Sequence, residues 1–143
     1  MQLFSHDTKA DALGRAPLFK SLSRGELVEL AKVTEDLEVA EGKVLAYEGD
    51  IGQEFFVIVE GNVSVSKDGE EVNALGPGDF FGEIALIWDS PRRTATVTAV
   101  SPLRFFVLTR QAFRNLISHQ PEIERRVLGA LEERVGGQPG ATA

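Results

Sequence analysis

Hydrophobic and polar residues are spaced in three different ways along this chain. Apolar residues recur at helical spacing in residues 1–34, form short segments separated by turns in residues 35–109, and return to helical spacing in residues 110–135. The pattern predicts helices at both ends of the chain with β-structure between them. The sequence shows no internal repeat and no interdomain linker, so we expect residues 1–135 to form a single domain. Glycine-rich residues 136–143 are expected to form a flexible tail.

The N-terminal zone carries a helix-start signal. Ser23 and Glu26 have the spacing of a capping box, in which each side chain accepts a hydrogen bond from the other residue's backbone N–H group. Leu27 and Leu30 follow at helical spacing, which predicts a helix that begins after Ser23. The preceding segment, Pro17–Phe19, is expected to be a connector with buried apolar side chains.

Turn residues divide the central zone into short apolar segments. Eight of the 14 glycines fall between Gly42 and Gly82, and Val63 and Val65 alternate with serine at the two-residue period of a strand. Many short strands at regular spacing are typical of a sandwich, jelly roll or barrel. We predict strands within residues 44–47, 55–59, 63–65, 72–75, 94–100 and 103–108.

Two helices are predicted after the β zone. Thr109 suits the N-cap of a helix over residues 110–118, and Pro121 suits the first position of a second helix. The second helix has an apolar stripe with one residue in every four, which must be buried against another surface. The stripe consists of Ile123, Val127, Leu131 and Val135.

Composition argues against several kinds of chemistry. The chain contains no cysteine, so it offers no disulfide, thiolate metal site or cysteine nucleophile. Its two histidines, His6 and His119, lie near opposite ends of the sequence, which argues against a histidine-based metal site. We therefore expect neither a metal nor a cofactor.

Charge and hydropathy limit the partners. The net charge of −7 argues against non-specific binding of nucleic acid, which depends on neutralising many phosphates. The longest apolar runs, residues 55–59 and 84–88, are far shorter than the roughly 20 residues that span a bilayer. The N-terminus has no apolar signal segment. We expect a cytoplasmic protein that binds neither nucleic acid nor membrane.

The segment 80–97 carries the candidate chemistry. Gly82 begins a short apolar turn of good helix formers, and the N–H groups at a helix N-terminus suit an anion. Arg92 and Arg93 precede a strand that should be apolar, and an arginine directed into a barrel needs an anionic partner such as a phosphate. Glu83 would repel a phosphate but can accept hydrogen bonds from sugar hydroxyls. A phosphate, a ribose and an apolar wall for a base together describe a cyclic mononucleotide.

Two stretches of this segment resemble the phosphate-binding cassette of cyclic nucleotide-binding domains. They are residues 82–85 (Gly-Glu-Ile-Ala) and residues 91–97 (Pro-Arg-Arg-Thr-Ala-Thr-Val). The family includes the regulatory subunit of protein kinase A, nucleotide-gated channels and the catabolite activator protein, and the resemblance covers about residues 17–135. It implies a mainly β fold with flanking helices: a β-roll or jelly-roll barrel with N-terminal helices, a short cassette helix and C-terminal helices.

The resemblance also implies roles for single residues. Glu83 would accept the ribose 2′-hydroxyl, Arg93 would bind the cyclic phosphate, and Thr94 would offer its N–H and hydroxyl groups to the phosphate or the base. The backbone at Gly82 and Ala85 would cradle the phosphate and ribose. Val65, Leu75 and Phe81 would wall the purine. The full ligand-binding set that the resemblance implies is Gly82, Glu83, Ile84, Ala85, Arg93, Thr94, Ala95, Val65, Leu75 and Phe81.

The spacing within the cassette leaves one alternative open. Glu83 and Arg93 are ten positions apart, as in the activator-protein branch, whereas many family members have nine. Arg92 therefore remains a rival for the phosphate.

By resemblance, the chain is a non-enzymatic sensor whose C-terminal helix moves over the base when ligand binds. We expect cyclic AMP as the ligand, with cyclic GMP as the alternative because the Thr94 hydroxyl can bond the guanine 2-amino group. Expected partners are an effector domain or protein, or a second copy that pairs through the C-terminal helix. The chain could instead be the ligand-binding fragment of a larger transcription regulator, channel or kinase.

Two other classes fit the sequence less well. A complete DNA-binding regulator needs a helix-turn-helix domain after the barrel, and only 34 residues follow Thr109. An enzyme of the cupin type needs histidine and carboxylate metal ligands, and the β zone contains no histidine.

Overall fold

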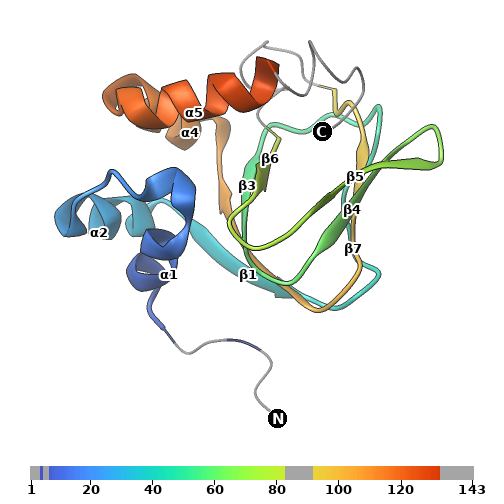
Figure 1. The fold of residues 1–143 in the computed structure, drawn as a ribbon, viewed down its shortest axis with the longest axis horizontal. Helices are drawn as coiled ribbons and strands as arrows, with labels where there is room; N and C mark the ends of the chain where they lie inside the picture. Colours follow the sequence, from blue (N-terminus) through green and yellow to red (C-terminus); the bar gives the residue numbers. More distant parts are fainter. Residues whose placement is uncertain (1–3, 5–6, 83–91, 133–143) are drawn as a thin grey trace.

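The computed structural model describes residues 4, 7–82 and 92–132. In this part of the chain, helices precede and follow a central group of strands as the sequence predicts, and in space the helices lie together on one side of the strands (Figure 1). The helical elements are α1 (Lys9–Arg15), the 3₁₀ helix η1 (Pro17–Phe19), α2 (Arg24–Lys32), α4 (Arg110–His119) and α5 (Pro121–Glu132). The strands are β1 (Glu35–Val39), β2 (Val44–Ala46), β3 (Phe55–Glu60), β4 (Val63–Lys67), β5 (Glu70–Leu75), β6 (Phe80–Phe81), β7 (Thr96–Ala99) and β8 (Leu103–Leu108).

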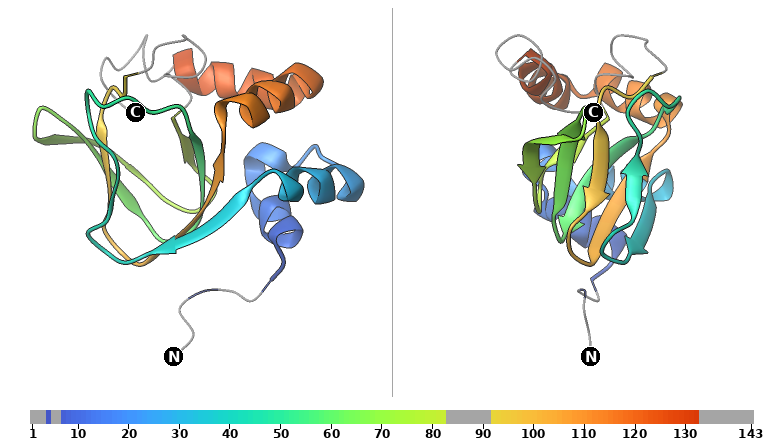
Figure 2. Two further views of the ribbon diagram at one scale, coloured as in Figure 1. Left: turned by 180° about the vertical axis from the view of Figure 1, so that it is seen from behind. Right: turned by 90° about the vertical axis from the view of Figure 1, so that its right-hand side faces the viewer.

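The strands form two antiparallel four-stranded sheets that face each other (Figure 2). Sheet A has the order β1-β8-β3-β6, and sheet B has the order β2-β7-β4-β5. Apart from β4 and β5, which form a hairpin, neighbours in each sheet are distant in sequence, so the chain crosses repeatedly between sheets as in a jelly roll. The expected β-roll with N-terminal and C-terminal helices is therefore confirmed.

The central strands of sheet A, β3 and β8, are covered on both faces, which explains why the sequence of β3 is a continuous apolar run. Phe56 and Ile58 point into the space between the sheets, whereas Phe55 and Val57 point toward the helices. All four side chains are buried. We call the hydrophobic cluster between the sheets the inner core and the cluster between sheet A and the helices the outer core. A strand covered on both faces needs no polar alternation.

The predicted helix starts are present. The Ser23 N–H donates to Glu26 Oε1 at 2.8 Å and the Glu26 N–H donates to Ser23 Oγ at 3.2 Å, which completes the capping box. Thr109 Oγ1 accepts the Ala112 N–H at 3.2 Å, and Pro121 is the first residue of α5. The predicted connector is the helix η1, and its apolar side chains are buried as expected.

Two strands have no counterpart among the predictions. Strand β6 has only two residues, Phe80 and Phe81, which pair with Val57 and Phe56, and so short a strand shows no periodicity in the sequence. Strand β1 reads Glu-Asp-Leu-Glu-Val, and its charges hide the alternation because it is an edge strand open to solvent. The other strands agree with the prediction to within two residues at each end.

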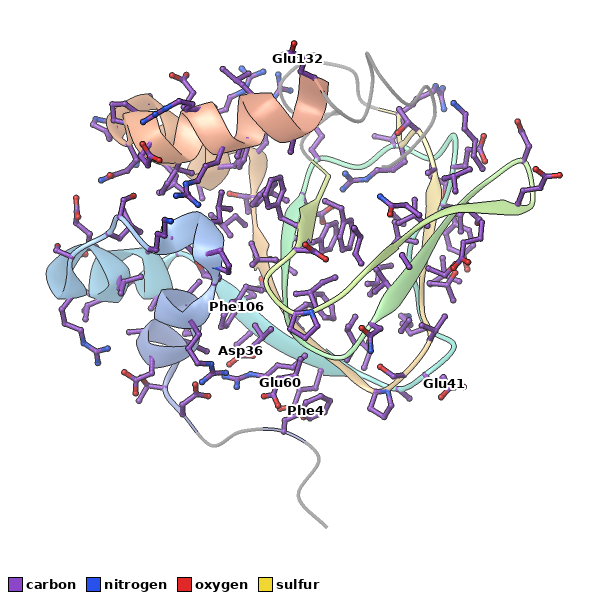
Figure 3. All side chains as sticks on the ribbon, viewed as in Figure 1. Phe4, Asp36, Glu41, Glu60, Phe106 and Glu132 are labelled. Atoms are coloured by element: carbon purple, nitrogen blue, oxygen red, sulfur yellow. The ribbon has the colours of Figure 1, made fainter. Side chains whose placement is uncertain are left out.

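A buried arginine holds the N-terminal segment against sheet A. The Arg104 guanidinium donates two hydrogen bonds to the Asp36 carboxylate, at 3.1 and 2.8 Å, and one to Asp7 at 2.8 Å. Glu60 accepts a longer contact at 3.4 Å, and the guanidinium also lies over the Phe106 ring. Asp36, Glu60 and Phe106 gather at the end of sheet A beside the N-terminal segment (Figure 3). The hydrogen bonds that Arg104 donates to Asp36 raise the pKa of Arg104 above its ordinary value.

Candidate ligand-binding site

Arg93 is the central residue of the candidate site. Only 4% of its surface is exposed, although it carries a full charge. Its backbone N–H donates to the Asp50 carbonyl and its carbonyl accepts the Gly49 N–H, each at 2.8 Å. These two bonds tie the segment before β7 to the loop between β2 and β3, which fixes the point where the Arg93 side chain leaves the backbone.

The guanidinium of Arg93 lies at the start of β3. Its Nη2 donates to the Glu54 carbonyl at 3.0 Å and lies 3.4 Å from the Glu54 carboxylate. Its carbon centre lies 5.5 Å from the centroid of the Phe56 ring, within cation–π range. The side chain is thus held by one carbonyl, one partly exposed carboxylate and one aromatic face.

Two glycines make room for this side chain. A Cβ atom at Gly52 would lie 2.3 Å from Arg93 Nε, closer than any real contact. A Cβ atom at Gly82 would lie 2.5 Å from the Glu54 carbonyl oxygen and 3.1 Å from Arg93 Nη1, and Gly82 has a φ of +98°. Glycine at both positions is therefore required by the placement of the guanidinium, and at Gly82 also by the backbone conformation.

The structure separates the two rival arginines. Arg92 is exposed, its Nη1 donates to the Gly49 carbonyl at 2.7 Å, and it forms an isolated β-bridge with Ile51. Arg93, one residue later, points to the opposite side and is buried. The arginine that the fold brings between the sheets is therefore Arg93.

The residues expected to wall the purine all lie in the inner core. Val65, Leu75 and Phe81 come from β4, β5 and β6, and each is buried. The Phe81 ring stacks on Phe56 with centroids 4.5 Å apart, so it is one ring away from the Arg93 guanidinium. This arrangement is compatible with the predicted wall, and contact with a base stays a prediction.

The remaining cassette residues are only partly described. Ala95 is fully buried in the inner core, and Thr94 is half-buried at the start of the same segment. Glu83, Ile84 and Ala85 lie outside the described residues, as does the expected cassette helix. Their predicted roles stay predictions.

Sequence reasoning did not identify three residues around Arg93: Gly52, Glu54 and Phe56. Gly52 follows the turn Glu48-Gly49-Asp50, where a second glycine is common, and Glu54 and Phe56 lie just before and within a predicted strand. Their proximity to Arg93 depends on contacts about 40 positions apart in sequence. No local pattern in the sequence therefore pointed to these three residues.

Helix α5 packs against the N-terminal elements. Its stripe residues Ile123 and Val127 are fully buried in the outer core. Arg126 Nη1 donates to the Pro17 carbonyl at 3.1 Å, and the Gln120 amide, just before the helix, donates to Glu26 at 2.7 Å. Burial of the stripe is confirmed for these two residues; the Leu131 side chain and Val135 lie outside what the structure describes.

The described residues support no metal site. Within residues 7–82 and 92–132, no three His, Cys, Asp or Glu side chains gather as metal ligands would. Over the same residues, no helix has the length and apolar character needed to cross a membrane.

What the site offers chemically is therefore a buried, preoriented guanidinium. Its planar fork can donate two parallel hydrogen bonds to oxygens of one anion. An inner core of aromatic and aliphatic side chains adjoins it. The fold and the buried guanidinium thus define a jelly-roll domain with a candidate anion site.

Comparison with known proteins identifies the family. The family model described as cyclic nucleotide-binding domain matches residues 36–120, more than half of the sequence. The chain belongs to the cyclic nucleotide-binding domain family.

Its relatives include proteins of different activity. A cyclic nucleotide-gated potassium channel of Rhizobium etli is 38% identical over 86% of this chain and 34% of the channel. A cAMP-dependent protein kinase regulatory subunit of Eremothecium gossypii is 40% identical over 80% of this chain and 25% of the subunit. The solved structure of a cAMP-binding acyltransferase from Mycobacterium smegmatis is similar with a TM-score of 0.73 and 33% identity, over 90% of this chain and 41% of that one. The chain thus spans a quarter to two fifths of the length of these relatives.

Proposed function

We propose that this chain binds a cyclic mononucleotide, with cyclic AMP as the preferred ligand, through the guanidinium of Arg93. The observation that carries the proposal is a buried arginine flanked by Gly52 and Gly82, next to an apolar inner core. The cyclic phosphate is a monoanion with two exocyclic oxygens, which matches the single charge and the paired N–H donors of one guanidinium. Both the kinase regulatory subunit and the acyltransferase among the relatives are named for cAMP.

The other parts of the nucleotide are assigned by the cassette motif. Glu83 accepts the ribose 2′-hydroxyl, the backbone of residues 82–85 cradles phosphate and ribose, and Val65, Leu75 and Phe81 wall the purine. Thr94 bonds the phosphate or the base, and its hydroxyl leaves cyclic GMP as a second ligand. A tenfold preference between the two nucleotides is only about 1.4 kcal/mol, which a single hydrogen bond supplies.

The domain acts as a non-catalytic sensor that reports binding through α5. Ligand occupancy would favour a state in which the apolar stripe of α5 covers the base, so that binding shifts the population of two helix positions. We place the sensor domain at residues 1–135, with residues 136–143 as a tail. Since the relatives are several-fold longer than the match, the downstream partner is an effector domain, a separate protein or a second copy paired through α5.

A second candidate role is regulation of an enzyme within the same chain. It is favoured by the acyltransferase among the relatives, in which the similar region is 41% of the solved chain. In that case the segment described here keeps its binding role, and catalysis belongs to another part of the protein.

Isothermal titration with cyclic AMP and cyclic GMP tests the binding function directly. Replacing Arg93 by alanine removes a charge-assisted contact from a largely enclosed site and should weaken cyclic AMP binding by about 2–5 kcal/mol, roughly 30- to 4,000-fold. Arg92→Ala is the matched control, because Arg92 is the neighbouring, exposed arginine. Normal binding by Arg93→Ala together with loss by Arg92→Ala would show that the wrong arginine carries the phosphate.

A further inference from the structure

The two sheets are unpaired along one side of the roll, which leaves a groove between their edge strands. Strands β1 and β2 are the outermost strands of sheets A and B, and a turn over residues 40–43 connects them. Glu41, labelled in Figure 3, lies in this turn at the corner of the roll. From this turn, β1 leads into sheet A and β2 into sheet B.

The groove has an apolar floor. It encloses about 480 Å³, within the range of small-molecule sites. Phe56, Phe105 and Val107 form the floor from the inner face of sheet A, and Leu37, 40% exposed on β1, forms part of one wall. The groove adjoins the candidate nucleotide site: neither Arg93 nor Gly82 lines it, but Glu54 and Phe56, which contact Arg93, do.

Two carboxylates lie at the end of the groove that is farther from the turn. Glu35 pairs with Val107, and Val107 pairs with Phe56, so that these three residues form one row across the inner face of sheet A. Glu54 precedes β3 at the same end, and its side chain is 54% exposed. The Glu54 carboxylate lies 3.4 Å from Arg93 Nη2, and Lys43 lines the groove from the turn at the other end. Glu35, Glu54 and Arg93 together carry one net negative charge, and the floor beside them is apolar.

We propose that this groove is a second ligand site, which takes a small amine with an aromatic or alkyl body. The apolar body would cover Leu37, which is 40% exposed, and the half-buried Val107, and the ammonium would lie between Glu35 and Glu54. Burial of the body supplies affinity, and the paired carboxylates supply selectivity for a cation over a neutral or anionic ligand of the same shape.

Occupation of the groove has a direct consequence for Arg93. The Glu54 carboxylate is 3.4 Å from Arg93 Nη2. An ammonium on Glu54 competes for that carboxylate and changes the surroundings of the guanidinium, which keeps its bond to the Glu54 carbonyl. The change around Arg93 is expected in the nucleotide-free protein. It can therefore be observed whether or not the chain binds cyclic AMP.

The test is an NMR titration of the nucleotide-free protein with 2-phenylethylamine. The expected result is saturable shifts of the backbone amides of Glu35, Leu37 and Val107, together with a shift of the Arg93 Nε–H signal. The comparison ligands 2-phenylethanol and 3-phenylpropionate keep the apolar body and remove or reverse the charge. Both should bind at least threefold more weakly than the amine.

Matched variants locate the ammonium. Glu35→Gln and Glu54→Gln should each weaken amine binding at least threefold, and Glu54→Gln should also abolish the shift at Arg93. Glu38→Gln, on the same strand as Glu35 but directed to its other face, should leave binding unchanged. The proposal is overturned if the amine shifts none of the groove amides, if the anion binds as well as the amine, or if Glu38→Gln weakens binding as much as Glu35→Gln.

Discussion

Replacing Gly52 is the most direct test of the site, because a side chain at this position would collide with Arg93. A Cβ atom at this position would lie 2.3 Å from Arg93 Nε and 2.9 Å from both Cζ and Nη2. Ordinary contact begins near 3.4 Å, so in Gly52→Ala the middle of the arginine side chain must move by about 1.1 Å. Arg93 is buried, and its backbone is bonded on both sides, so the movement falls on the guanidinium.

The magnitude follows from what the guanidinium would lose. A hydrogen bond to a charged group contributes about 1.5–3 kcal/mol, which corresponds to roughly 10- to 150-fold in affinity. We therefore expect Gly52→Ala to weaken cyclic AMP binding by that factor. Overpacking should also lower the free energy of unfolding of the nucleotide-free protein by about 1–3 kcal/mol.

The assays are isothermal titration for binding and urea unfolding for stability. Gly25→Ala is the control, since a Cβ atom at Gly25 in helix α2 meets only Ser23 Oγ at 3.9 Å. That variant should keep its affinity and gain about 0.5–1 kcal/mol of stability. Gly82→Ala is a poorer test, because the φ of +98° adds backbone strain to any effect on Arg93.

A double-mutant cycle decides whether Gly52 acts through Arg93. In an Arg93→Ala background the space beside Gly52 is vacated, so Gly52→Ala should cost almost no stability there. Equal destabilisation in the wild-type and Arg93→Ala backgrounds would refute the reasoning, as would unchanged cyclic AMP affinity in Gly52→Ala alone.

Three further predictions concern the ribose, the N-terminal anchor and the last helix. 2′-Deoxy cyclic AMP should bind at least tenfold more weakly than cyclic AMP in a titration, because the Glu83 carboxylate then lacks its donor; equal affinity would remove that role from Glu83. Arg104→Ala should lower the free energy of unfolding in urea by about 3 kcal/mol, since it leaves the partly buried Asp7, Asp36 and Glu60 without their shared cation, and a loss below 1 kcal/mol would contradict this. Amide hydrogen exchange across residues 122–132 should change when cyclic AMP binds, and high protection that ligand leaves unaltered would show α5 to be a fixed element.

Local signals in the sequence were sufficient for most of the elements. The capping box at Ser23 and the N-cap at Thr109 are encoded within four residues, and both form. Arg93 was preferred through the cassette motif, whereas its distance from Glu83 left Arg92 open as a rival. The burial of Arg93 then follows from strand alternation, which separates it from Arg92.

The surroundings of Arg93 could not be derived in the same way. Glu54 and Gly52 approach it because the loop between β2 and β3 is bonded to the segment before β7, a pairing about 40 positions apart. No local pattern specifies the order of strands in a sheet. In sheet A, the order β1-β8-β3-β6 makes neighbours of β1 and β8, the first and last strands along the sequence. The edge strand β1 was not predicted from the sequence for a related reason. Its inner face carries Glu35 among apolar residues, because the roll is open at that edge.

Strand β3 is the structural element shared by the candidate site and the C-terminal helices. Phe56 on its inner face lies under the Arg93 guanidinium, and the adjacent Phe55 on its outer face packs on Phe113 of α4 with centroids 4.5 Å apart. Phe113 lies in the same outer core as Ile123 of α5. A chain of contacts does not by itself transmit a signal, since coupling requires two states that the ligand binds with different affinity. Hydrogen exchange in α5 measures that difference directly, and doing so in Arg93→Ala would separate an effect of the bound phosphate from one of the base.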